Sequence, residues 1–221
     1  MVKKLVIFGV GQIAELAHHY FSTDSDYEVV AFTVDAAYRL ESEFFGLPVV
    51  PFESISEHFP PSEYSMFIAL SYSGLNSIRA NKFSAARQLG YGLASYVSSR
   101  ANYLSSSSPG ENCFILEDNT IQPFVRIGEN VTLWSGNHIG HHSTLADHCF
   151  ISSHVVISGG VTVGAYSFIG VNATLRDHIT IGEKCVLGAG VLILTDAEAG
   201  GVYMGTASPR SKIPSSRLRG L

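Results

Sequence analysis

Residues 139–162 read IGHHST LADHCF ISSHVV ISGGVT, four units of six residues that each begin with Ile or Leu. The register continues in both directions without an insertion, and thirteen consecutive units begin with an aliphatic residue. An α-helix would repeat every ~3.6 residues and an isolated strand every second residue, so neither explains the pattern. A period of six predicts a β-helix, whose units cannot bury their apolar faces alone and become stable by stacking. The thirteen positions are Ile115, Ile121, Ile127, Leu133, Ile139, Leu145, Ile151, Ile157, Val163, Ile169, Leu175, Ile181 and Leu187.

The repeat resembles that of the hexapeptide-repeat acyltransferases, whose domain is a left-handed parallel β-helix. The resemblance implies a hand opposite to the usual right-handed crossover, three hexapeptides in each coil, and a triangular prism with one flat sheet on each side. In that geometry the aliphatic residue points into the prism, and the small residue that often follows it, such as Gly140 or Gly164, lets the chain turn a corner. The pattern is specific for the fold and less specific for the chemistry, because function resides in the residues carried on a fold.

The composition is that of an ordinary globular protein, with 46% hydrophobic and 15% charged residues among 221. The formal net charge of −5 argues against a nucleic-acid partner. No run of eighteen apolar residues exists, so we expect no membrane insertion. The opening segment is too short for a signal peptide and leads into a glycine turn, so we expect a cytoplasmic protein.

The three cysteines, Cys113, Cys149 and Cys185, are spaced by 36 residues, which is two coils of the implied geometry. They would lie on one side of the prism about 9.6 Å apart, given a strand spacing of about 4.8 Å. This separation exceeds the limit of about 7 Å between Cα atoms for a disulfide. We therefore expect small buried core residues with free thiols.

The first hundred residues alternate strand and helix patterns, which predicts a small doubly wound parallel sheet of the Rossmann type. The segment from Lys3 to Gly9 has the composition of a buried parallel strand and runs through the turn Gly9-Val10-Gly11-Gln12 into a helix. We place a domain boundary near residue 100, with a front domain over 1–100 and a β-helix domain with its C-terminal tail over 101–221. Further strands are expected over 27–34, 46–50, 64–70 and 93–97, and helices over 13–21, 51–58 and 76–89.

Five residues of the front domain fall at the carboxyl ends of predicted strands, which is where such sheets bind ligands. A helix N-terminus behind a glycine turn also offers free N–H groups to a phosphate. The full dinucleotide fingerprint would need another glycine where Ala14 stands, so a plain turn between strand and helix is an alternative. Asp35 either meets a ribose or base edge or is a solvated loop carboxylate. The five candidates are Gly11, Gln12, Asp35, Ser71 and Tyr72.

A Rossmann-like half, a hexapeptide β-helix and a tail with Gly205 and Pro209 together resemble the bacterial nucleotide-sugar N-acetyltransferases. Those enzymes acetylate a 4-amino group on a dideoxy sugar linked to a nucleoside diphosphate, with acetyl-CoA as co-substrate. They serve the biosynthesis of surface sugars such as the O-antigen of lipopolysaccharide. The resemblance implies that the front domain binds the nucleotide, that the β-helices form a homotrimer, and that acetyl-CoA lies in the groove between neighbouring β-helices. It implies no metal.

The catalytic histidine of that family lies in a unit of the form aliphatic-x-His-acid, which matches the unit beginning at Ile139 and assigns the general base to His141. A histidine suits this role because the attacking amine arrives largely as an ammonium and must lose a proton near neutral pH. Where the family commonly has Glu or Asp, this chain has His142. His141 is therefore expected to be oriented by His142, by another group such as Asp147 or an acid of a neighbouring subunit, or by none.

Gly159 and Gly160 stand one coil after His141. Two glycines would let a backbone N–H approach the thioester and stabilise the oxyanion, and a glycine corner without a ligand is the alternative. The resemblance assigns the contacts with acetyl-CoA, as backbone hydrogen bonds and apolar packing, to Phe150, Gly159, Val171 and Ala189.

Other functions remain open at this point. Six of the nine histidines lie between His138 and His178, and histidine is a common zinc ligand, so a zinc hydratase similar to the gamma-class carbonic anhydrases is one alternative. Those trimers lack a nucleotide-binding front domain. A nearer alternative is an O-acetyltransferase on a sugar hydroxyl, similar to the sialic-acid O-acetyltransferases, and another is a purely structural trimer. If no metal binds, His148 and His154 are ordinary corner or surface residues, as are His138 and His178.

Overall fold

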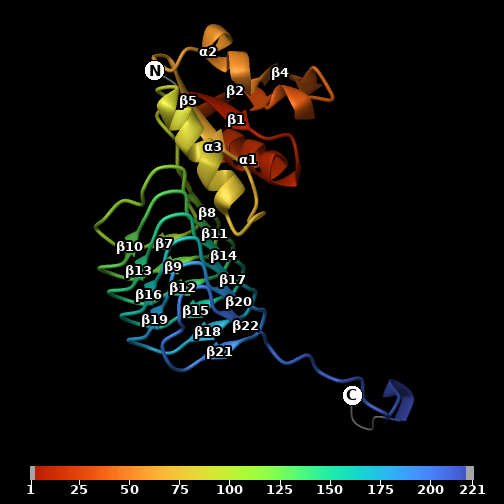
Figure 1. The fold of residues 1–221 in the computed structure, drawn as a ribbon, viewed down its shortest axis with the longest axis vertical. Helices are drawn as coiled ribbons and strands as arrows, with labels where there is room; N and C mark the ends of the chain where they lie inside the picture. The colour runs from red at the N-terminus through yellow and green to blue at the C-terminus, as the bar shows by residue number, and fades with distance from the viewer. Residues whose placement is uncertain (1–2, 218–221) are drawn as a thin grey trace.

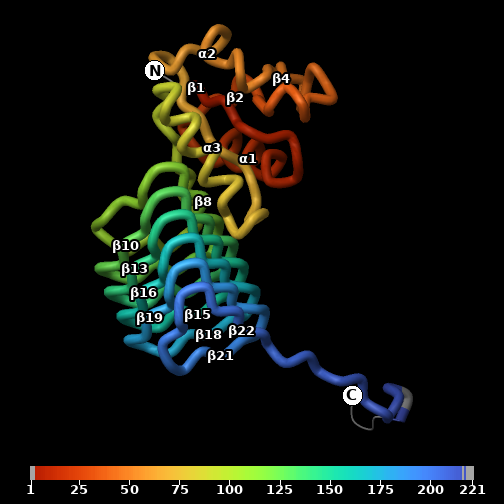
Figure 2. The backbone as a smooth tube through the Cα atoms, viewed as in Figure 1, coloured from red at the N-terminus to blue at the C-terminus, as the bar shows by residue number. Residues whose placement is uncertain are grey.

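The computed structural model describes residues 3–217, which form a front domain at one end, a β-helix below it and a tail that extends away (Figure 1). The backbone trace shows the β-helix as a stack of coils of similar size beneath the front domain (Figure 2). Within this range, none of the helices has the length and the apolar character that crossing a bilayer requires.

The front domain is built on a five-stranded sheet in the order β3-β4-β2-β1-β5. Its strands are parallel except β3, which pairs antiparallel with β4 at one edge. The predicted Rossmann-like sheet is thereby confirmed. The strands are β1 (Lys3–Phe8), β2 (Tyr27–Val34), β3 (Glu43–Phe44), β4 (Leu47–Pro51) and β5 (Tyr64–Ile68). The helices are α1 (Gln12–Thr23), α2 (Ile55–His58) and α3 (Ser77–Gln88), and the 3-10 turns are η1 (Ala36–Tyr38) and η2 (Phe52–Ser54).

The turn between β1 and α1 brings the helix close to the end of β5. Gly9 has a φ of +125°, and a Cβ at this position would lie 2.8 Å from the carbonyl oxygen of Ala69, so the turn requires glycine. α1 then buries Ala14, Ala17 and Phe21 against the sheet. The N-terminus of α1 is therefore held beside the carboxyl ends of β1 and β5.

Three parallel sheets of two-residue strands form the sides of the β-helix. Each strand pairs with the strand one coil further along, as His138 pairs with Val156, so a coil contains three hexapeptides as expected. The thirteen aliphatic positions are buried in one continuous core together with the three cysteines, whose thiols are free. Burial raises the pKa of both Cys113 and Cys149 to about 12, which keeps these thiols protonated.

The chain visits the sides in a fixed order, and we number them 1, 2 and 3 in that order. Side 1 contains β6 (Tyr96–Val97), β8 (Phe114–Ile115), β11 (Thr132–Leu133), β14 (Phe150–Ile151), β17 (Phe168–Ile169), β20 (Val186–Leu187) and β22 (Val202–Tyr203). Side 2 contains β7 (Asn102–Tyr103), β9 (Thr120–Ile121), β12 (His138–Ile139), β15 (Val156–Ile157), β18 (Thr174–Leu175) and β21 (Leu192–Ile193). Side 3 contains β10 (Arg126–Ile127), β13 (Thr144–Leu145), β16 (Thr162–Val163) and β19 (Thr180–Ile181).

The corners of the prism are made three positions after the aliphatic residue, not at the small residue next to it. A left-handed backbone recurs at that position in residues such as His142, His148 and His154. The small residues have another role, because a Cβ on Gly140 would lie 2.5 Å from the backbone nitrogen of Gly159 in the next coil. The expectation that these glycines turn the corners is therefore wrong, and they instead allow successive coils to stack closely.

The segment 93–97 does not form the predicted fifth strand of the front sheet. Leu93 makes a single bridge to Met66, and β6 instead begins side 1 by pairing with β8. The Ser95 hydroxyl donates to the carbonyl oxygen of Gly110 at 2.8 Å and accepts the N–H of Cys113 at 2.8 Å, which directs the chain into the first coil. Side 1 thus begins shortly before residue 100, where the sequence predicts the domain boundary.

α3 connects the front domain to the β-helix through buried polar contacts. Asn76, which precedes the helix, donates its amide to the carbonyl oxygen of Tyr166 at 3.0 Å. Arg79 donates to the Thr132 hydroxyl at 2.6 Å and to the carbonyl oxygen of His148 at 3.1 Å. Arg79 is only 1% exposed, and burial lowers its pKa to about 10. These contacts fix the front domain on the first coils.

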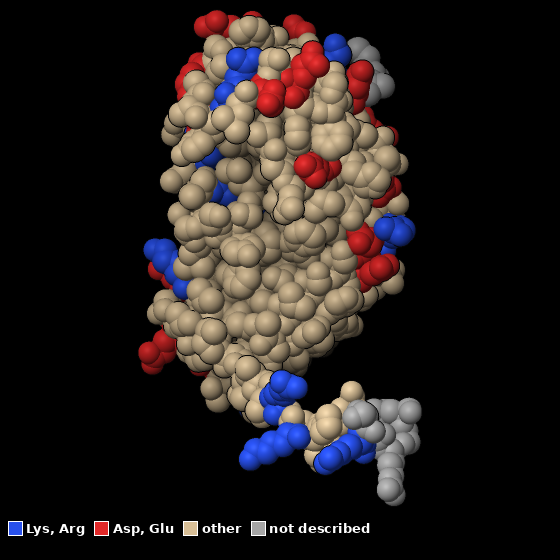
Figure 3. All heavy atoms as spheres, turned by 90° about the vertical axis from the view of Figure 1, so that its right-hand side faces the viewer, with Lys and Arg blue, Asp and Glu red and all other residues tan. Residues whose placement is uncertain are grey.

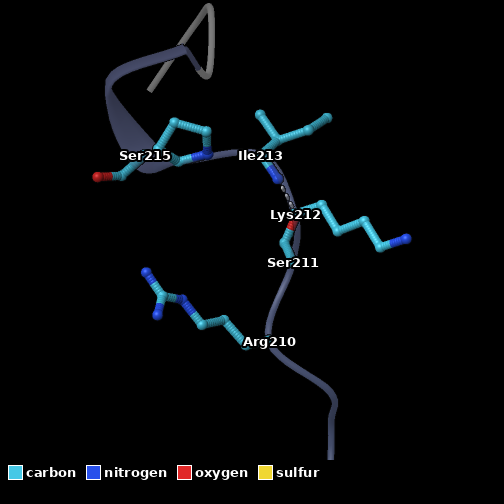
Figure 4. A pocket seen from close by; sticks show the side chains of 6 residues that line it. Arg210, Ser211, Lys212, Ile213 and Ser215 are labelled. Atoms are coloured by element: carbon cyan, nitrogen blue, oxygen red, sulfur yellow. Dashed lines mark hydrogen bonds between the residues drawn. The ribbon is translucent and has the colours of Figure 1, made fainter.

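Beyond β22 the tail leaves the β-helix and reaches η3 (Ser215–Arg217) (Figure 1). A hollow of about 690 Å³ lies beside Arg210 to Ser215, and its lining side chains all come from this one segment (Figure 4). We therefore place no site there. On the face seen in Figure 3, charged side chains gather over the front domain, along the edges and on the tail, and a broad central area of the β-helix carries few of them.

Candidate functional site

A cleft of about 460 Å³ lies at the carboxyl ends of β1 and β5, over the N-terminus of α1. It is lined by residues 9–13 and 69–73, and it brings together four predicted site residues, Gly11, Gln12, Ser71 and Tyr72. The first N–H groups of a helix have no partner within the helix and carry a partial positive charge. This cleft can therefore hold an anionic group such as a phosphate.

Asp35 lies outside the lining of this cleft and forms an ion pair with Lys82 of α3. The Nζ atom of Lys82 lies 5.3 Å from the ring centre of Phe8 and 5.0 Å from that of Phe52. Asp35 is thus a paired carboxylate in partly buried surroundings, which differs from the solvated loop carboxylate considered from the sequence. A contact between Asp35 and a nucleotide stays a prediction.

Tyr72 connects the cleft to side 1 of the β-helix. Its ring centre lies 5.0 Å from that of Phe150 and 4.7 Å from that of Phe168. Phe150 is 3% exposed and packs under the guanidinium of Arg79, whose carbon lies 5.8 Å from the ring centre. The Phe150 side chain therefore packs between the front domain and the β-helix. If Phe150 contacts acetyl-CoA as predicted, the contact is made by its backbone.

His141 lies at the corner between sides 2 and 3, where the coils before and after it fix its position. Its backbone N–H donates to Oε1 of Gln122 at 2.8 Å, and its carbonyl oxygen accepts the N–H of Gly160 at 2.8 Å. A Cβ on Gly159 would lie 2.6 Å from Cε1 and 2.7 Å from Nε2 of His141, so the imidazole lies directly against this glycine. The side chain is exposed. Since the N–H of Gly160 is already bonded, Gly159 is the better candidate for an oxyanion donor.

His142 lies beside His141, and the two Nδ1 atoms are 3.1 Å apart. The ring of His142 packs on Phe124, with ring centres 4.6 Å apart and planes inclined by 36°. Asp147 lies at a different corner, between sides 3 and 1, where its carboxylate accepts the N–H of Glu129 at 2.8 Å. The suggestion that Asp147 orients His141 is therefore wrong, whereas His142 is a titratable group in contact with His141.

Val171 and Ala189 lie one coil apart at the corner between sides 1 and 2. The N–H of Gly190 donates to the carbonyl oxygen of Val171 at 2.8 Å, which aligns the two coils. Val171 is 43% exposed, so this corner presents an apolar side chain to its surroundings. It lies across the width of side 2 from His141 and Gly159.

Within one chain, the predicted site residues other than Asp35 and Phe150 fall into three separate groups. The cleft lies above side 1, the residues His141, His142 and Gly159 lie at the corner between sides 2 and 3, and Val171 and Ala189 lie at the corner between sides 1 and 2. In a three-sided prism the corner between sides 2 and 3 faces away from side 1. Each group is brought together within the chain, and the groups are held apart from one another.

Three residues that contact predicted site residues were not predicted from the sequence. Gln122 and Phe124 contact His141 and His142 from the preceding coil, and a search of that coil in the repeat register would have found them. Lys82 carried no comparable signal, because a lysine on a helix is usually solvated.

Two other histidines of the β-helix, His148 and His154, have structural partners. The Nδ1 atom of His148 lies 2.9 Å from the side-chain nitrogen of Asn130, and burial lowers the pKa of His148. The ring of His154 packs against Gly136 in the preceding coil. Among residues 3–217, no three His, Cys, Asp or Glu side chains are grouped so that they could hold a metal ion.

Residues 124–159 and 160–195 match the family model of the bacterial transferase hexapeptide (six repeats). Comparison with curated protein sequences gives no significant match. Among solved structures, the acetyltransferase domain of PglB from Neisseria gonorrhoeae FA1090 is similar with a TM-score of 0.81 and 25% identity, covering 92% of this chain and 97% of that chain. The same domain has been solved in complex with acetyl coenzyme A.

Two further structures are similar over nearly the whole chain. PerB from Caulobacter crescentus, in complex with CoA and GDP-perosamine, has a TM-score of 0.80 at 24% identity and covers 93% of this chain and 95% of that chain. WeeI from Acinetobacter baumannii AYE has a TM-score of 0.77 at 17% identity and covers 92% and 97%. The fold class predicted from the sequence, a Rossmann-like sheet followed by a left-handed β-helix, is confirmed. The repeat is that of the bacterial hexapeptide transferases, and the predicted resemblance to the sugar acetyltransferases of this architecture is confirmed with it.

Proposed function

We propose that this chain is an acetyl-CoA-dependent N-acetyltransferase that acts on the amino group, at C4, of a nucleoside-diphosphate-linked amino-dideoxy sugar, with His141 as the general base. The observation that carries this proposal is the fixed, exposed imidazole of His141 against Gly159, in a fold that also has a cleft at the N-terminus of α1. The whole-chain similarity to PerB, solved with CoA and GDP-perosamine, supports the choice of both substrates.

The chemistry needs one base and one hydrogen-bond donor. The substrate amine attacks the thioester carbon in its neutral form, so an N–C bond forms and the C–S bond then breaks. The Nε2 atom of His141 takes the proton that the amine loses and returns it to the departing CoA thiolate. In this proposal the N–H of Gly159 donates to the oxyanion of the tetrahedral intermediate. No covalent enzyme intermediate is required, because the thiolate is already a good leaving group.

The nucleotide binds in the front cleft in this proposal. The backbone N–H groups at Gln12 receive a phosphate at the N-terminus of α1, and Tyr72 and Ser71 form the opposite wall. The carboxylate of Asp35, held by Lys82, accepts a ring N–H of a uracil, thymine or guanine base. Sugars of this kind are made in the cytoplasm for bacterial surface polysaccharides such as the O-antigen, and we place the chain in that process.

The separation of the three groups within one chain indicates that the complete site forms between chains. Side 2 and its edges present exposed apolar side chains, with Val156 40%, Val171 43%, Leu192 60% and Leu194 50% exposed. Apolar surface of this kind is typically covered by a partner. A homotrimer with cyclic symmetry covers this apolar surface on each of its three chains through the same contact. The same arrangement brings the corner with His141 next to the cleft and the acetyl-CoA groove of a neighbouring chain.

The test is an acetyl-CoA assay with matched sugars. Purified protein is incubated with acetyl-CoA and the UDP, GDP or dTDP derivative of a 4-amino-4,6-dideoxy sugar, and thiol release is measured. The matched control is the 4-hydroxy sugar on the same nucleotide. We expect thiol release with the amino sugar only, and we expect His141→Asn to lower kcat by about 10²–10⁴-fold with little change in the KM for acetyl-CoA.

The alternatives give different outcomes in the same experiment. Acetylation of the hydroxy sugar alone would replace the proposal by an O-acetyltransferase. Absence of thiol release from all six sugars, together with about one zinc per chain in the purified protein, would replace it by a metal-dependent hydratase. Full activity of His141→Asn would remove His141 as the base.

A further inference from the structure

The imidazole of His142 contacts the imidazole of His141 through the Nδ1 atoms of the two rings. The two Nδ1 atoms lie 3.1 Å apart, and the ring planes are inclined by 85°. A neutral imidazole carries one hydrogen on its two nitrogens. A hydrogen bond between the two Nδ1 atoms therefore requires that one of them donates and the other accepts. The hydrogen bond therefore decides which nitrogen of His141 is free.

We propose that His142 is a positioning residue whose Nδ1 accepts the Nδ1–H of His141 and thereby leaves Nε2 of His141 free to take the substrate proton. This inference rests on the proposed function. An imidazole here does what a carboxylate does for a catalytic histidine elsewhere, because either acceptor fixes the tautomer and the orientation of the ring.

His142 is itself held so that its Nδ1 faces His141. Its backbone has the left-handed conformation, with φ of +60°, and its N–H donates to the carbonyl oxygen of Pro123 at 3.3 Å. Its ring packs on Phe124 in the preceding coil. These contacts leave the ring little freedom to turn away from His141.

The contact between His141 and His142 also affects the proton that His141 takes from the substrate. When Nε2 of His141 takes a proton from the attacking amine, His141 becomes an imidazolium that still donates from Nδ1. The hydrogen bond to the neutral His142 stabilises this cation, and the positive charge is shared if the bridging proton moves to Nδ1 of His142. The bridging proton then returns to Nδ1 of His141, the proton on Nε2 of His141 goes to the CoA thiolate, and both rings are neutral again. No other reactant is required.

The experiment compares His142→Phe, which keeps an aromatic ring on Phe124 and removes the acceptor, with His142→Glu, which supplies a carboxylate. We expect His142→Phe to lower kcat by roughly 10–100-fold, the loss typical when a partner that orients a metal-bound histidine is removed, with little change in either KM. We expect His142→Glu to retain at least about a third of the wild-type kcat, because the carboxylate accepts the same hydrogen. The matched control is His178→Phe, at the same corner position two coils further on, which should have wild-type kcat.

A second readout does not depend on activity. Nitrogen-15 NMR of the imidazoles, assigned with His141→Asn, reports which nitrogen of neutral His141 carries hydrogen. We expect hydrogen at Nδ1 in the wild type and at Nε2 in His142→Phe. If His142→Phe has wild-type kcat, or if Nε2 of His141 is protonated in the wild type, the positioning role is overturned. Both results leave the proposed function standing as long as His141→Asn remains impaired.

Discussion

At the scale of single residues, the contact between His141 and Gly159 is the closest link between the fold and the proposed chemistry. The imidazole of a base must stand within a few tenths of an ångström of its working position, and a displacement of about 1 Å can cost 10²-fold in rate. Here the glycine allows that position, because any side chain on residue 159 would occupy the space of the imidazole. The glycine is therefore part of the site although it carries no functional group.

This contact gives a prediction for Gly159→Ala. The new Cβ would lie 2.6 Å from Cε1 of His141, which is too close, and the imidazole must move. We expect kcat to fall by about 10–100-fold while the midpoint of thermal unfolding changes little, because the ring is exposed and can swing outward. The matched control is Gly92→Ala, where nothing lies within 4 Å of the added Cβ. Wild-type kcat in Gly159→Ala would show that the ring is not held as described.

The sequence predicts His141 but not its surroundings, and the reason is physical. The position of His141 in its hexapeptide is a local pattern that a single unit displays. Its contacts with Gln122 and Gly159 come from the coils before and after it, so they depend on the stacking register. The hexapeptide that contains His141 also does not show where Asp147 lies. The carboxylate of Asp147 is held at another corner, where it accepts the N–H of Glu129.

At the scale of elements, α3 is attached to the β-helix by a buried cation. Arg79 donates to Thr132, to the side chain of Asn76 and to two backbone carbonyl oxygens, and none of these partners is an acid. Its Nε atom has no hydrogen-bond partner. Such a cation costs desolvation free energy, and the hydrogen bonds of its two terminal nitrogens offset part of that cost.

We therefore predict that Arg79→Met destabilises the protein. The substitution leaves buried polar groups on Thr132 and Asn76 without a partner, and each costs about 1–3 kcal/mol in the free energy of unfolding. The control is Arg87→Met on the same helix, whose exposed ion pairs with Glu111 and Glu129 are worth about 0–1 kcal/mol. Urea unfolding of both variants measures the difference. An equal effect of the two substitutions would show that the buried contacts add nothing.

The C-terminal end of α1 is attached to the start of the β-helix by the carboxylate of Asp24. The carboxylate of Asp24 accepts the Tyr96 hydroxyl at 2.6 Å and the N–H of Ser99 at 2.9 Å. The hydrogen bonds from Tyr96 and Ser99 lower the pKa of Asp24 to about 2. This carboxylate therefore contributes stability at neutral pH through its charged form.

The lowered pKa of Asp24 predicts how the free energy of unfolding changes at acidic pH. The folded pKa of Asp24 lies below its value of 3.8 in the unfolded chain, so the unfolded state binds the proton more readily and stability falls as pH falls. The contribution is complete above the unfolded pKa and is lost as pH drops through about 2. We expect the difference in unfolding free energy between wild type and Asp24→Asn to shrink over this range, as measured by urea unfolding at pH 6 to pH 2. A difference that is independent of pH would exclude a role for the charge.

The elements themselves were largely predictable because their signals are periodic. The alternation of strands and helices in the front domain and the period of six in the β-helix each follow from burial of one face. The segment 93–97 was one exception, since its apolar composition suits a strand in either sheet and the hydrogen bonds of Ser95 decide between them. Those bonds reach Gly110 and Cys113, and no local pattern reveals them.

At the scale of the whole molecule, one chain holds the cleft above side 1 and holds His141 at the corner that faces away from side 1. A rigid attachment through Arg79 and Asn76 prevents the front domain from swinging around the prism to close this gap. The proposed reaction therefore requires a neighbouring chain to supply one of the two parts. Light scattering that shows a monomer at micromolar concentration would exclude this arrangement.

Mixed oligomers test the shared site directly. His141→Asn removes the base, and Gly11→Asp places a negative charge where we expect a phosphate, at a position where no atom lies within 4 Å of an added Cβ. Each variant alone should be nearly inactive. In a cyclic trimer that contains both, one site combines an intact cleft with an intact His141 from the neighbour, so co-expressed and doubly tagged trimers should regain about a third of the wild-type activity. If cleft and base served the same chain, no intact pair would exist in any mixed trimer, and the doubly tagged protein would stay as inactive as its parents.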